Sequence, residues 1–287
     1  MKLWSACVLA MSILFLPIAA QQATSEGFPS TIEAGRAFSV EFAGSGQGTL
    51  YIVGPNEMLK RTVTLGSANQ LPAGTLCNAG HYSFLLDGGA QSRDGEFDVV
   101  PAAQVSDVSF LAKPSRLPVG LHDGITGAIY VFDSYRNLIT RPMPVYFELS
   151  GQSGSKQVRS GTTHDGSAST AMDSTPQQGV DKFLVRVGDI SSTRIIRQVP
   201  GDPCRLVMKA KPAGSRVQLV TDPVRDCNGN QVPDGTIVTF TENYGAEQST
   251  ADVPLKQGIA QIEMPSRAGA TISVASGVVL GNQIRWE

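Results

Sequence analysis

One loop of this sequence carries four oxygen-bearing side chains at the spacing of a calcium-binding loop, Asp226, Asn228, Asn230 and Asp234. Side chains at the first, third, fifth and ninth positions of such a loop can turn their oxygens toward one cation. The match is incomplete, because the twelfth position holds Ile237 in place of a bidentate glutamate. A turn closed by the side chains of Asp226 and Asn230 is the alternative, and the mismatch favours it. We therefore expect no cofactor, with calcium at this loop as the hypothesis to test.

The residue types of common active sites are present, but their spacing does not indicate catalysis. The three histidines, His81, His122 and His164, show no spacing typical of a metal site. Ser160 and Asp165 flank His164, but the surrounding SGTTHDGSAST is rich in the small polar residues of a hairpin connection. Catalytic triads are defined by geometry in the fold, so adjacency in sequence does not indicate one. The sequence predicts that the protein is not an enzyme.

The N-terminus indicates export. Lys2 precedes an apolar run from Leu3 to Phe15, and small residues lead to Ala20 before a polar stretch begins. This is the pattern of a secretory signal peptide over residues 1–20. An uncleaved anchor is the alternative, since the run is close to the lower limit for crossing a bilayer. We expect a secreted, periplasmic or cell-surface protein with no membrane span after signal cleavage.

Composition indicates a β-rich globular protein without a strong electrostatic preference. The chain has 23 basic and 25 acidic residues, a formal net charge of −2, and these residues are interspersed along its length. A nucleic-acid-binding protein would carry a basic stripe, so we expect no nucleic-acid partner. Thirty glycines and seventeen prolines fit many short strands joined by tight turns, and no long stretch has apolar residues at helical spacing. The predicted class is all-β.

Two stretches of the chain align without a gap, VFDSYRNLITRPMPVYF from Val131 and VRDCNGNQVPDGTIVTF from Val224. Asp133 then falls on Asp226, an offset of 226 − 133 = 93 residues. A repeat of this length is a whole domain and is too long for a solenoid unit. The chain is therefore predicted to be a short array of related β-domains.

The repeat and the junctions divide the chain into three β-domains after the signal peptide. A Pro-bearing junction begins at Val199, and each of the last two domains opens with an apolar segment ending in Ala-Lys-Pro. From that Pro to the aligned aspartate there are 133 − 114 = 19 residues in the second domain and 226 − 212 = 14 in the third, so the second has an insertion around Leu117 to Gly124. Short Pro-bearing junctions favour a semi-rigid array. The predicted domains are residues 21–103, 104–199 and 200–287.

The first domain shows the alternation of half-buried strands. Apolar residues recur at every second position in Phe38-Ser39-Val40-Glu41-Phe42 and in Tyr82-Ser83-Phe84. Such strands bury one face in a sandwich. The segment from Asn78 to Tyr82 resembles the tyrosine corner of immunoglobulin-like domains, in which a buried tyrosine anchors the start of a late strand through its hydroxyl.

The third domain carries a family resemblance. Its sequence DCNGNQVPDG from Asp226, the strand Thr236–Phe240 and the later Gly258-Ile259-Ala260 resemble the bacterial immunoglobulin-like domain of the invasin/intimin type. In that family a strand ends at Asp, a Gly-Asn turn and a Val-Pro pair follow, and a strand with inward Val and Phe comes next. The second domain departs from this pattern, with Arg136 at the turn glycine and Thr140 at the proline. The resemblance implies tandem immunoglobulin-like sandwiches in an envelope or extracellular protein.

Three cysteines follow the signal peptide, Cys77, Cys204 and Cys227. Cys204 begins the first strand of the third domain and Cys227 follows the second strand, and a hairpin turn between these strands brings both ends side by side. We therefore predict a disulfide between Cys204 and Cys227. Cys77 is left over and reads as a buried small residue, with pairing to another chain as the alternative.

Two functions remain open. The first is a non-enzymatic rod of sandwiches that serves as a spacer or as a protein–protein interaction or adhesion module for an envelope or extracellular protein. The second is a glycan- or calcium-binding module that uses loops gathered at one end of a sandwich. Tyr135, which stands in the second domain where the third has Asn228, is the aromatic residue that could stack on a sugar. A tyrosine packed across its own loop is the alternative.

Overall fold

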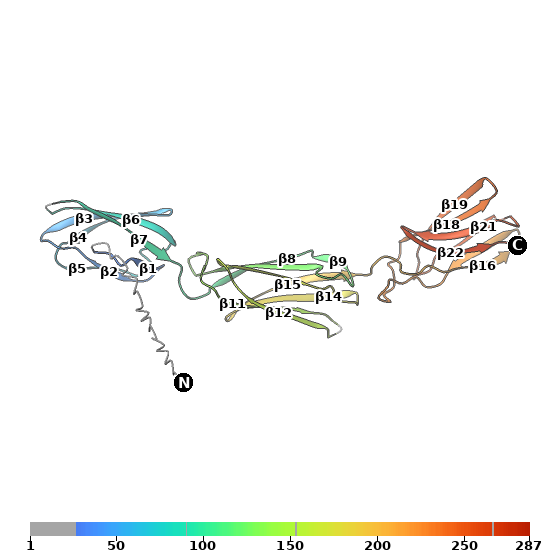
Figure 1. Cartoon of the computed structure of the whole chain (residues 1–287), viewed down its shortest axis with the longest axis horizontal. Coiled ribbons are helices and arrows are strands. Elements are labelled where there is room, and N and C mark those ends of the chain that lie inside the picture. Colours follow the sequence, from blue (N-terminus) through green and yellow to red (C-terminus); the bar gives the residue numbers. More distant parts are fainter. Residues whose placement is uncertain (1–26, 90, 153, 266) are drawn as a thin grey trace, which may run out of the picture. The chain divides into compact units, whose positions relative to one another are not determined.

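The computed structural model describes residues 27–89, 91–152, 154–265 and 267–287. The predicted signal peptide at residues 1–20 lies outside them. The described chain consists of strands and connecting turns (Figure 1), and it holds no helix long and apolar enough to cross a membrane. It divides into two compact units, one ending at Pro101 and the other beginning at Ala102. The predicted all-β class is confirmed.

The first unit packs two sheets around one core. Its strands are β1 (Thr31–Glu33), β2 (Phe38–Glu41), β3 (Gln47–Gly54), β4 (Glu57–Thr64), β5 (Ala68–Leu71), β6 (Gly80–Asp87) and β7 (Arg93–Val100). The larger sheet has the order β1-β7-β6-β3-β4, and β2 pairs with β5 in the smaller one. Alternation along β6 buries Tyr82, Phe84 and Leu86, because successive side chains of a strand point to opposite faces.

The second unit begins with a sandwich of two sheets. Its strands are β8 (Asp107–Lys113), β9 (Arg116–Pro118), β10 (Ile125–Phe132), β11 (Pro144–Ser150), β12 (Lys156–Thr162), β13 (Ser167–Met172), β14 (Gly179–Val187) and β15 (Ile190–Val199). The sheets have the orders β13-β10-β8 and β12-β11-β14-β15-β9. Val145 and Phe147 of β11 face the core between them.

A second sandwich follows in the same unit. Its strands are β16 (Met208–Ala213), β17 (Arg216–Thr221), β18 (Ile237–Tyr244), β19 (Glu247–Pro254), β20 (Gln261–Pro265), β21 (Thr271–Ser276) and β22 (Val279–Arg285). The sheets have the orders β16-β17-β20 and β19-β18-β21-β22. Val238 and Phe240 of β18 are fully buried, as the aligned repeat predicts from Val145 and Phe147.

The repeat is visible in the topology. The strand order β13-β10-β8 corresponds to β20-β17-β16, and β12-β11-β14-β15 corresponds to β19-β18-β21-β22. The added strand of the earlier sandwich is β9, which pairs parallel to β15 and lies where the insertion begins. Its Leu117 is buried in the core. Each of the three predicted domains contains one hydrophobic core, although the boundaries at residues 103 and 199 stay predictions.

Candidate functional site

The carboxylate of Asp226 closes the loop that follows β17. Its Oδ1 accepts hydrogen bonds from the backbone N–H groups of Asn228 (2.9 Å) and Asn230 (2.8 Å). Its Oδ2 accepts one from the N–H of Gly201 (2.9 Å) and one from Asn230 Nδ2 (3.0 Å). Burial alone raises a carboxyl pKa, but these hydrogen bonds outweigh it and hold the pKa of Asp226 below its ordinary value. The loop is a turn closed by an aspartate side chain.

Asp133 forms the same network one domain earlier. Its Oδ1 accepts hydrogen bonds from the N–H groups of Tyr135 (2.9 Å) and Asn137 (2.8 Å). Its Oδ2 accepts one from the N–H of Ala102 (2.9 Å) and one from Asn137 Nδ2 (2.9 Å). The aspartate is buried, with 1 % of its surface exposed. Each repeat thus uses a buried aspartate to tie a turn to the segment that leads into its own domain.

The two turns share a backbone conformation although one lacks glycine. Arg136 has a φ of 69°, and Gly229 has a φ of 83° at the aligned position. This left-handed region favours glycine, since other residues place Cβ close to the backbone. The guanidinium carbon of Arg136 lies 5.5 Å from the centroid of the Phe132 ring, and its Nη1 lies 3.5 Å from Asp107 Oδ2. Arginine at position 136, in place of the glycine of the third domain, therefore leaves the conformation of the turn unchanged.

The candidate calcium ligands engage different neighbours. Asn230 Oδ1 accepts a hydrogen bond from the N–H of Gln178 (3.1 Å), and its Nδ2 donates one to the carbonyl of Pro176 (2.9 Å). Asp234 Oδ1 accepts a hydrogen bond from the N–H of Gly258 (3.1 Å). The structure thus places Asn230 beside Asp226 and holds Asp234 against a different turn. Calcium binding at this loop stays a prediction.

Tyr135 and Asn228 occupy aligned positions but meet different surroundings. The Tyr135 side chain is partly exposed, and 39 % of the residue surface is accessible. Asn228 lies against Gly120, where an added Cβ would come within 2.6 Å of its Nδ2. A glycan contact at Tyr135 stays a prediction.

Cys204 and Cys227 form a disulfide, the pair favoured by the sequence. Their Cα atoms are 4.7 Å apart, and the N–H of Cys204 donates a hydrogen bond to the carbonyl of Arg225 (3.0 Å). The bond therefore joins the start of the third domain to the turn that contains Asp226. Cys77 is half-buried, and its Sγ lies 3.4 Å from the carbonyl of Gly74.

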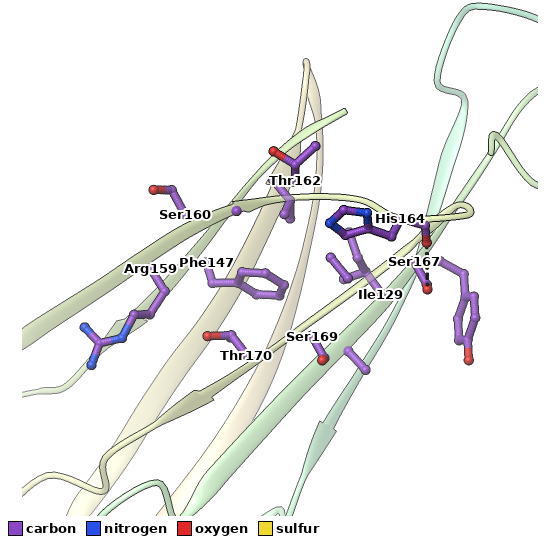
Figure 2. A pocket seen from close by; sticks show the side chains of 14 residues that line it. Ile129, Phe147, Arg159, Ser160, Thr162, His164, Ser167, Ser169 and Thr170 are labelled. Carbon is purple, nitrogen blue, oxygen red and sulfur yellow. Dashed lines mark hydrogen bonds between the residues drawn. The ribbon is translucent and has the colours of Figure 1, made fainter. Parts of the chain in front are cut away.

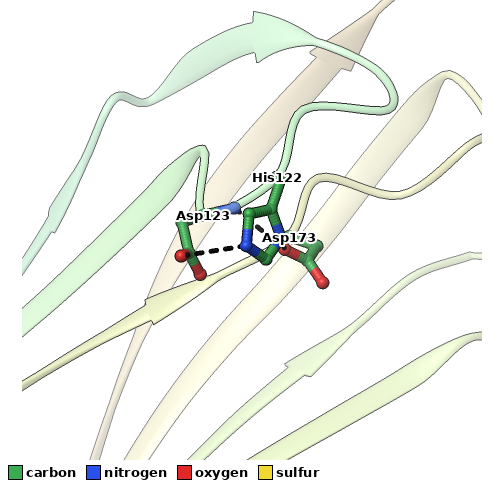
Figure 3. Close-up of side chains that lie close together, drawn as sticks. All are labelled: His122, Asp123 and Asp173. Atoms are coloured by element: carbon green, nitrogen blue, oxygen red, sulfur yellow. Dashed lines mark hydrogen bonds and ion pairs between the residues drawn. The ribbon is translucent and has the colours of Figure 1, made fainter.

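A histidine and two aspartates meet on the second domain (Figure 3). His122 Nδ1 lies 2.7 Å from Asp173 Oδ1, and its Nε2 lies 3.3 Å from Asp123 Oδ2. The N–H of Asp123 donates a hydrogen bond to Asp173 Oδ1 (2.8 Å). That hydrogen bond, and after it the His122 ring, lower the pKa of Asp173. The two ring nitrogens of His122 therefore face two different carboxylates.

No sequence pattern indicated this cluster. Asp123 adjoins His122 in the chain, but Asp173 lies 50 residues beyond Asp123. The register of β10 and β13, in which Ile125 pairs with Met172, brings the two aspartates together. The cluster could therefore be found only from the pairing of β10 with β13, which the sequence alone does not reveal.

His81 in the first unit is held in a similar way. Its Nδ1 lies 2.9 Å from Asp98 Oδ1 and its Nε2 lies 3.3 Å from Glu96 Oε2, and both carboxylates belong to the neighbouring strand β7. The hydrogen bond to Asp98 is the largest cause of a raised pKa for His81. The His81 side chain is exposed, so its contacts with Asp98 and Glu96 lie at the protein surface.

Tyr82 forms the corner that the sequence suggested. Its hydroxyl donates a hydrogen bond to the carbonyl of Asn78 (2.7 Å), four residues upstream, and it also contacts the carboxylate of Glu57. Burial, and then the bond to Glu57, raise the pKa of Tyr82. The ring is completely buried and stacks on Phe97 with centroids 5.3 Å apart. It fixes the start of β6 to the first core.

A cleft of about 480 Å³ opens between β12 and β13 of the second domain (Figure 2). Figure 2 shows Phe147 between the strand that carries Ser160 and the strand that carries Thr170, with His164 where the chain crosses from one to the other. The sequence around His164 and Asp165 indicates a turn, and no pattern in it predicts a cleft.

The overall structure is similar to a known adhesin. It matches the Escherichia coli adhesin FdeC with a TM-score of 0.60 at 14 % sequence identity, over 90 % of this chain and 95 % of that chain. The fold is immunoglobulin-like. At the level of this fold, the predicted resemblance to bacterial immunoglobulin-like domains is confirmed.

Two further solved structures align with this immunoglobulin-like chain. Invasin, a bacterial integrin-binding protein, has a TM-score of 0.46 at 14 % identity, and the alignment covers 90 % of this chain and 57 % of that chain. The FN1–FN3 domains of chicken CNTN1 have a TM-score of 0.37 at 10 % identity, with coverage of 88 % and 93 %. No protein-family model and no curated protein matches the sequence.

Proposed function

We propose that this chain is a non-enzymatic adhesion or interaction module of the cell envelope or cell surface, which binds an extracellular or envelope protein. The supporting observation is the similarity of its fold to the adhesin FdeC over 90 % of the chain. Immunoglobulin-like sandwiches present loops and strand edges on a rigid scaffold, which suits them to protein recognition. The tandem domains would also act as a spacer that carries the binding surface away from its attachment.

The proposal includes export through a signal peptide at residues 1–20, cleaved after Ala20. A disulfide between Cys204 and Cys227 supports an oxidising compartment, because such bonds persist outside the cytoplasm. The mature chain would be periplasmic, secreted or displayed on the surface.

The positions of two histidines support a non-enzymatic role. His81 and His122 each lie between two carboxylates, which engage both nitrogens of each ring. Neither ring is offered to a nucleophile by these contacts, as general base catalysis would require. The proposed work of the protein is therefore binding.

The experiment is cross-linking in the native envelope fraction, followed by mass spectrometry and reconstitution with purified partner. We expect one envelope or extracellular protein to be recovered reproducibly and to bind the purified oxidised chain directly. An unrelated array of three immunoglobulin-like domains is the matched control. Recovery of a glycan without protein would favour the alternative function, and glycan binding lost in Tyr135→Ala would assign it to that turn. Turnover of an envelope substrate by the purified chain would contradict the non-enzymatic proposal.

A further inference from the structure

The cleft of the second domain lies between two strand edges. β12 and β13 are the edge strands of their respective sheets. The floor is formed by Ile129, Val145 and Phe147, each of which is at most 2 % exposed. The walls are small or polar, and they include Ser160, Gly161, Thr162, Ser167, Ser169 and Thr170. The cleft is therefore a preformed slot with an apolar floor.

Both ends of the β13 edge are already paired. At one end Ser167 exchanges two backbone hydrogen bonds with His164 (2.8 and 3.0 Å). At the other end the side chain of Gln157 binds the backbone of Asp173, donating from Nε2 to its carbonyl (2.8 Å) and accepting its N–H at Oε1 (3.2 Å). A carboxamide in this position forms the two bonds that an added β-strand would form. The edge of β13 is thus oriented to accept a peptide group from the β12 side.

Between Ser167 and Asp173, every second residue of β13 points its backbone N–H and C=O groups toward the cleft. Backbone groups alternate in direction along a strand, and the outward groups of Ser167 and Asp173 are six residues apart. Ser169 and Ala171 therefore turn their N–H and C=O groups to the same side. The Ala171 carbonyl accepts a hydrogen bond from the Thr170 hydroxyl at 3.5 Å. This contact is long, so the N–H of a bound peptide can replace it.

The third domain shows why the slot is deep. Gly161 lies opposite Val145, and at the aligned place Val253 lies opposite Val238. Across the cleft, Thr170 aligns with Ile262, an offset of 262 − 170 = 92 residues. Two small residues in the second domain thus stand where the third carries branched apolar side chains.

The corresponding hollow in the third domain does not reach the core residues. It has about 420 Å³ and is bordered by Val253 and Ile259, and the residues that line it do not include Val238 or Phe240. In the second domain the lining extends to the equivalent core residues Val145 and Phe147. The difference gives the second domain room for a side chain from outside.

The lining of the cleft carries one permanently charged side chain, the guanidinium of Arg159. Arg159 pairs with Phe147 across β12 and β11, which places it on the same strand face as Gly161. His164 lies at the corner, and the lining residues include no Asp or Glu. The cleft therefore complements a carboxylate.

We propose that the cleft between β12 and β13 binds an extended peptide segment of the partner protein by strand addition. The peptide pairs with Ser169 and Ala171, inserts an apolar side chain between Gly161 and Thr170, and presents a carboxylate to Arg159. This inference rests on the proposed function, because it names the place where the module holds its protein partner. A sugar is less well matched, since the face of Phe147 is buried and the edge offers a strand's hydrogen bonds.

The test uses random 12-residue peptides displayed on phage, panned against the oxidised mature chain, and synthetic peptides made from the enriched sequences. We expect alternating apolar residues with an acidic residue. The double variant Gly161→Val/Thr170→Ile, which installs the third domain's residues, should weaken binding by about tenfold or more. Arg159→Ala should weaken it by about threefold to tenfold, as expected for loss of a partly exposed ion pair. Thr250→Ile on the exposed face of β19 is the matched control and should bind as the wild type does.

A second readout does not depend on the double variant Gly161→Val/Thr170→Ile, called the filled variant because its larger side chains fill the cleft. In the wild-type chain, peptide binding should shift the amide resonances of Ser169 and Ala171 and slow their hydrogen exchange. If the double variant does not fold by circular dichroism, Ser169→Pro carries the mutational test, because it removes one outward N–H. Proline is tolerated on edge strands.

The inference would be overturned if no peptide were enriched, if the double variant bound peptide as the wild type does, or if the double variant abolished a glycan-array signal. A native partner that binds the filled variant as tightly as the wild type would also overturn it while leaving the proposed function intact. Peptides that bind at Ser169 and Ala171 would support the cleft even if cross-linking yielded no native partner and the proposed function failed.

Discussion

The backbone N–H of Gly201 donates a hydrogen bond of 2.9 Å to the carboxylate of Asp226, 25 residues later. The same carboxylate closes its own turn, so one buried side chain fixes both the turn and the segment that leads into the third domain. Ala102 and Asp133 repeat this relationship in the second domain at 2.9 Å. The aspartate carboxylate that suggested a calcium loop therefore accepts structural hydrogen bonds at the aligned position of both repeats.

Replacing Asp226 by alanine should destabilise the third domain. The change leaves the N–H groups of Gly201, Asn228 and Asn230 without their acceptor, and hydrogen bonds to a charged group contribute about 1.5–3 kcal/mol. Urea unfolding followed by the fluorescence of Trp286, which packs on the third core, reports this loss. The exposed neighbour Asp202→Ala is the control and should unfold at the wild-type midpoint.

The contribution of Asp226 should depend on pH in a defined direction. Its pKa is lower in the folded than in the unfolded chain, so its stabilisation is present above the unfolded value of about 3.9. It is lost as pH falls through the folded pKa. The difference in unfolding free energy between wild type and Asp226→Asn should therefore shrink on acidification. A difference that grows in acid would contradict the hydrogen-bond network.

Removing the disulfide should weaken the third domain selectively. Its cysteines are separated by 23 residues. Cross-linking a loop of that size stabilises a fold by about 3 kcal/mol on the chain-entropy estimate. Cys204→Ser/Cys227→Ser should thus lower the urea midpoint seen by Trp286. Cys77→Ser serves as the matched control, and an equal effect from it would argue against a local staple.

Tyr82→Phe should loosen the first domain while keeping its core volume. The lost hydroxyl removes the hydrogen bond to the carbonyl of Asn78 and the contact with Glu57, whose Oε1 keeps only the N–H of Asn78 (3.4 Å), at a cost of about 1–3 kcal/mol. Hydrogen exchange of the peptide that contains β6 measures the effect. Tyr51→Phe on β3 is the control, and comparable exchange in both variants would show that the corner does not anchor the strand.

His81 should titrate above the ordinary histidine pKa in an NMR titration, because Asp98 favours its charged form. Asp98→Asn should bring its pKa down toward about 6.5, whereas the exposed Asp87→Asn should leave it unchanged. Since the folded pKa is the higher one, the stabilisation is complete below the unfolded pKa and is lost as pH rises through the folded pKa. An unchanged pKa in Asp98→Asn would remove the pair as its cause.

A calcium titration separates the two interpretations of the Asp226 loop. The carboxylate already accepts hydrogen bonds on both oxygens, so we expect unfolding to be the same with millimolar calcium and with a chelator. A large rise in melting temperature with calcium, lost in Asp234→Asn, would establish the metal site instead.

Local chemistry was readable in the sequence. Alternation predicted the inward Val238 and Phe240, because strand side chains change face at every residue. The aspartate turn was predictable because its donors lie two and four residues from Asp226. The partner Gly201 was not, since nothing in the sequence marks which distant N–H reaches the second oxygen.

The sequence by itself determined the all-β class, the domain repeat and the cysteine pair, because each depends on periodicity or on a short separation along the chain. Tertiary structure alone decided that Asp173 meets His122 and that Gly161 and Thr170 line the same cleft. These pairs come from strands whose register and sheet are set by burying a common core. Contacts across two sheets depend on how that whole core packs, which no local pattern records.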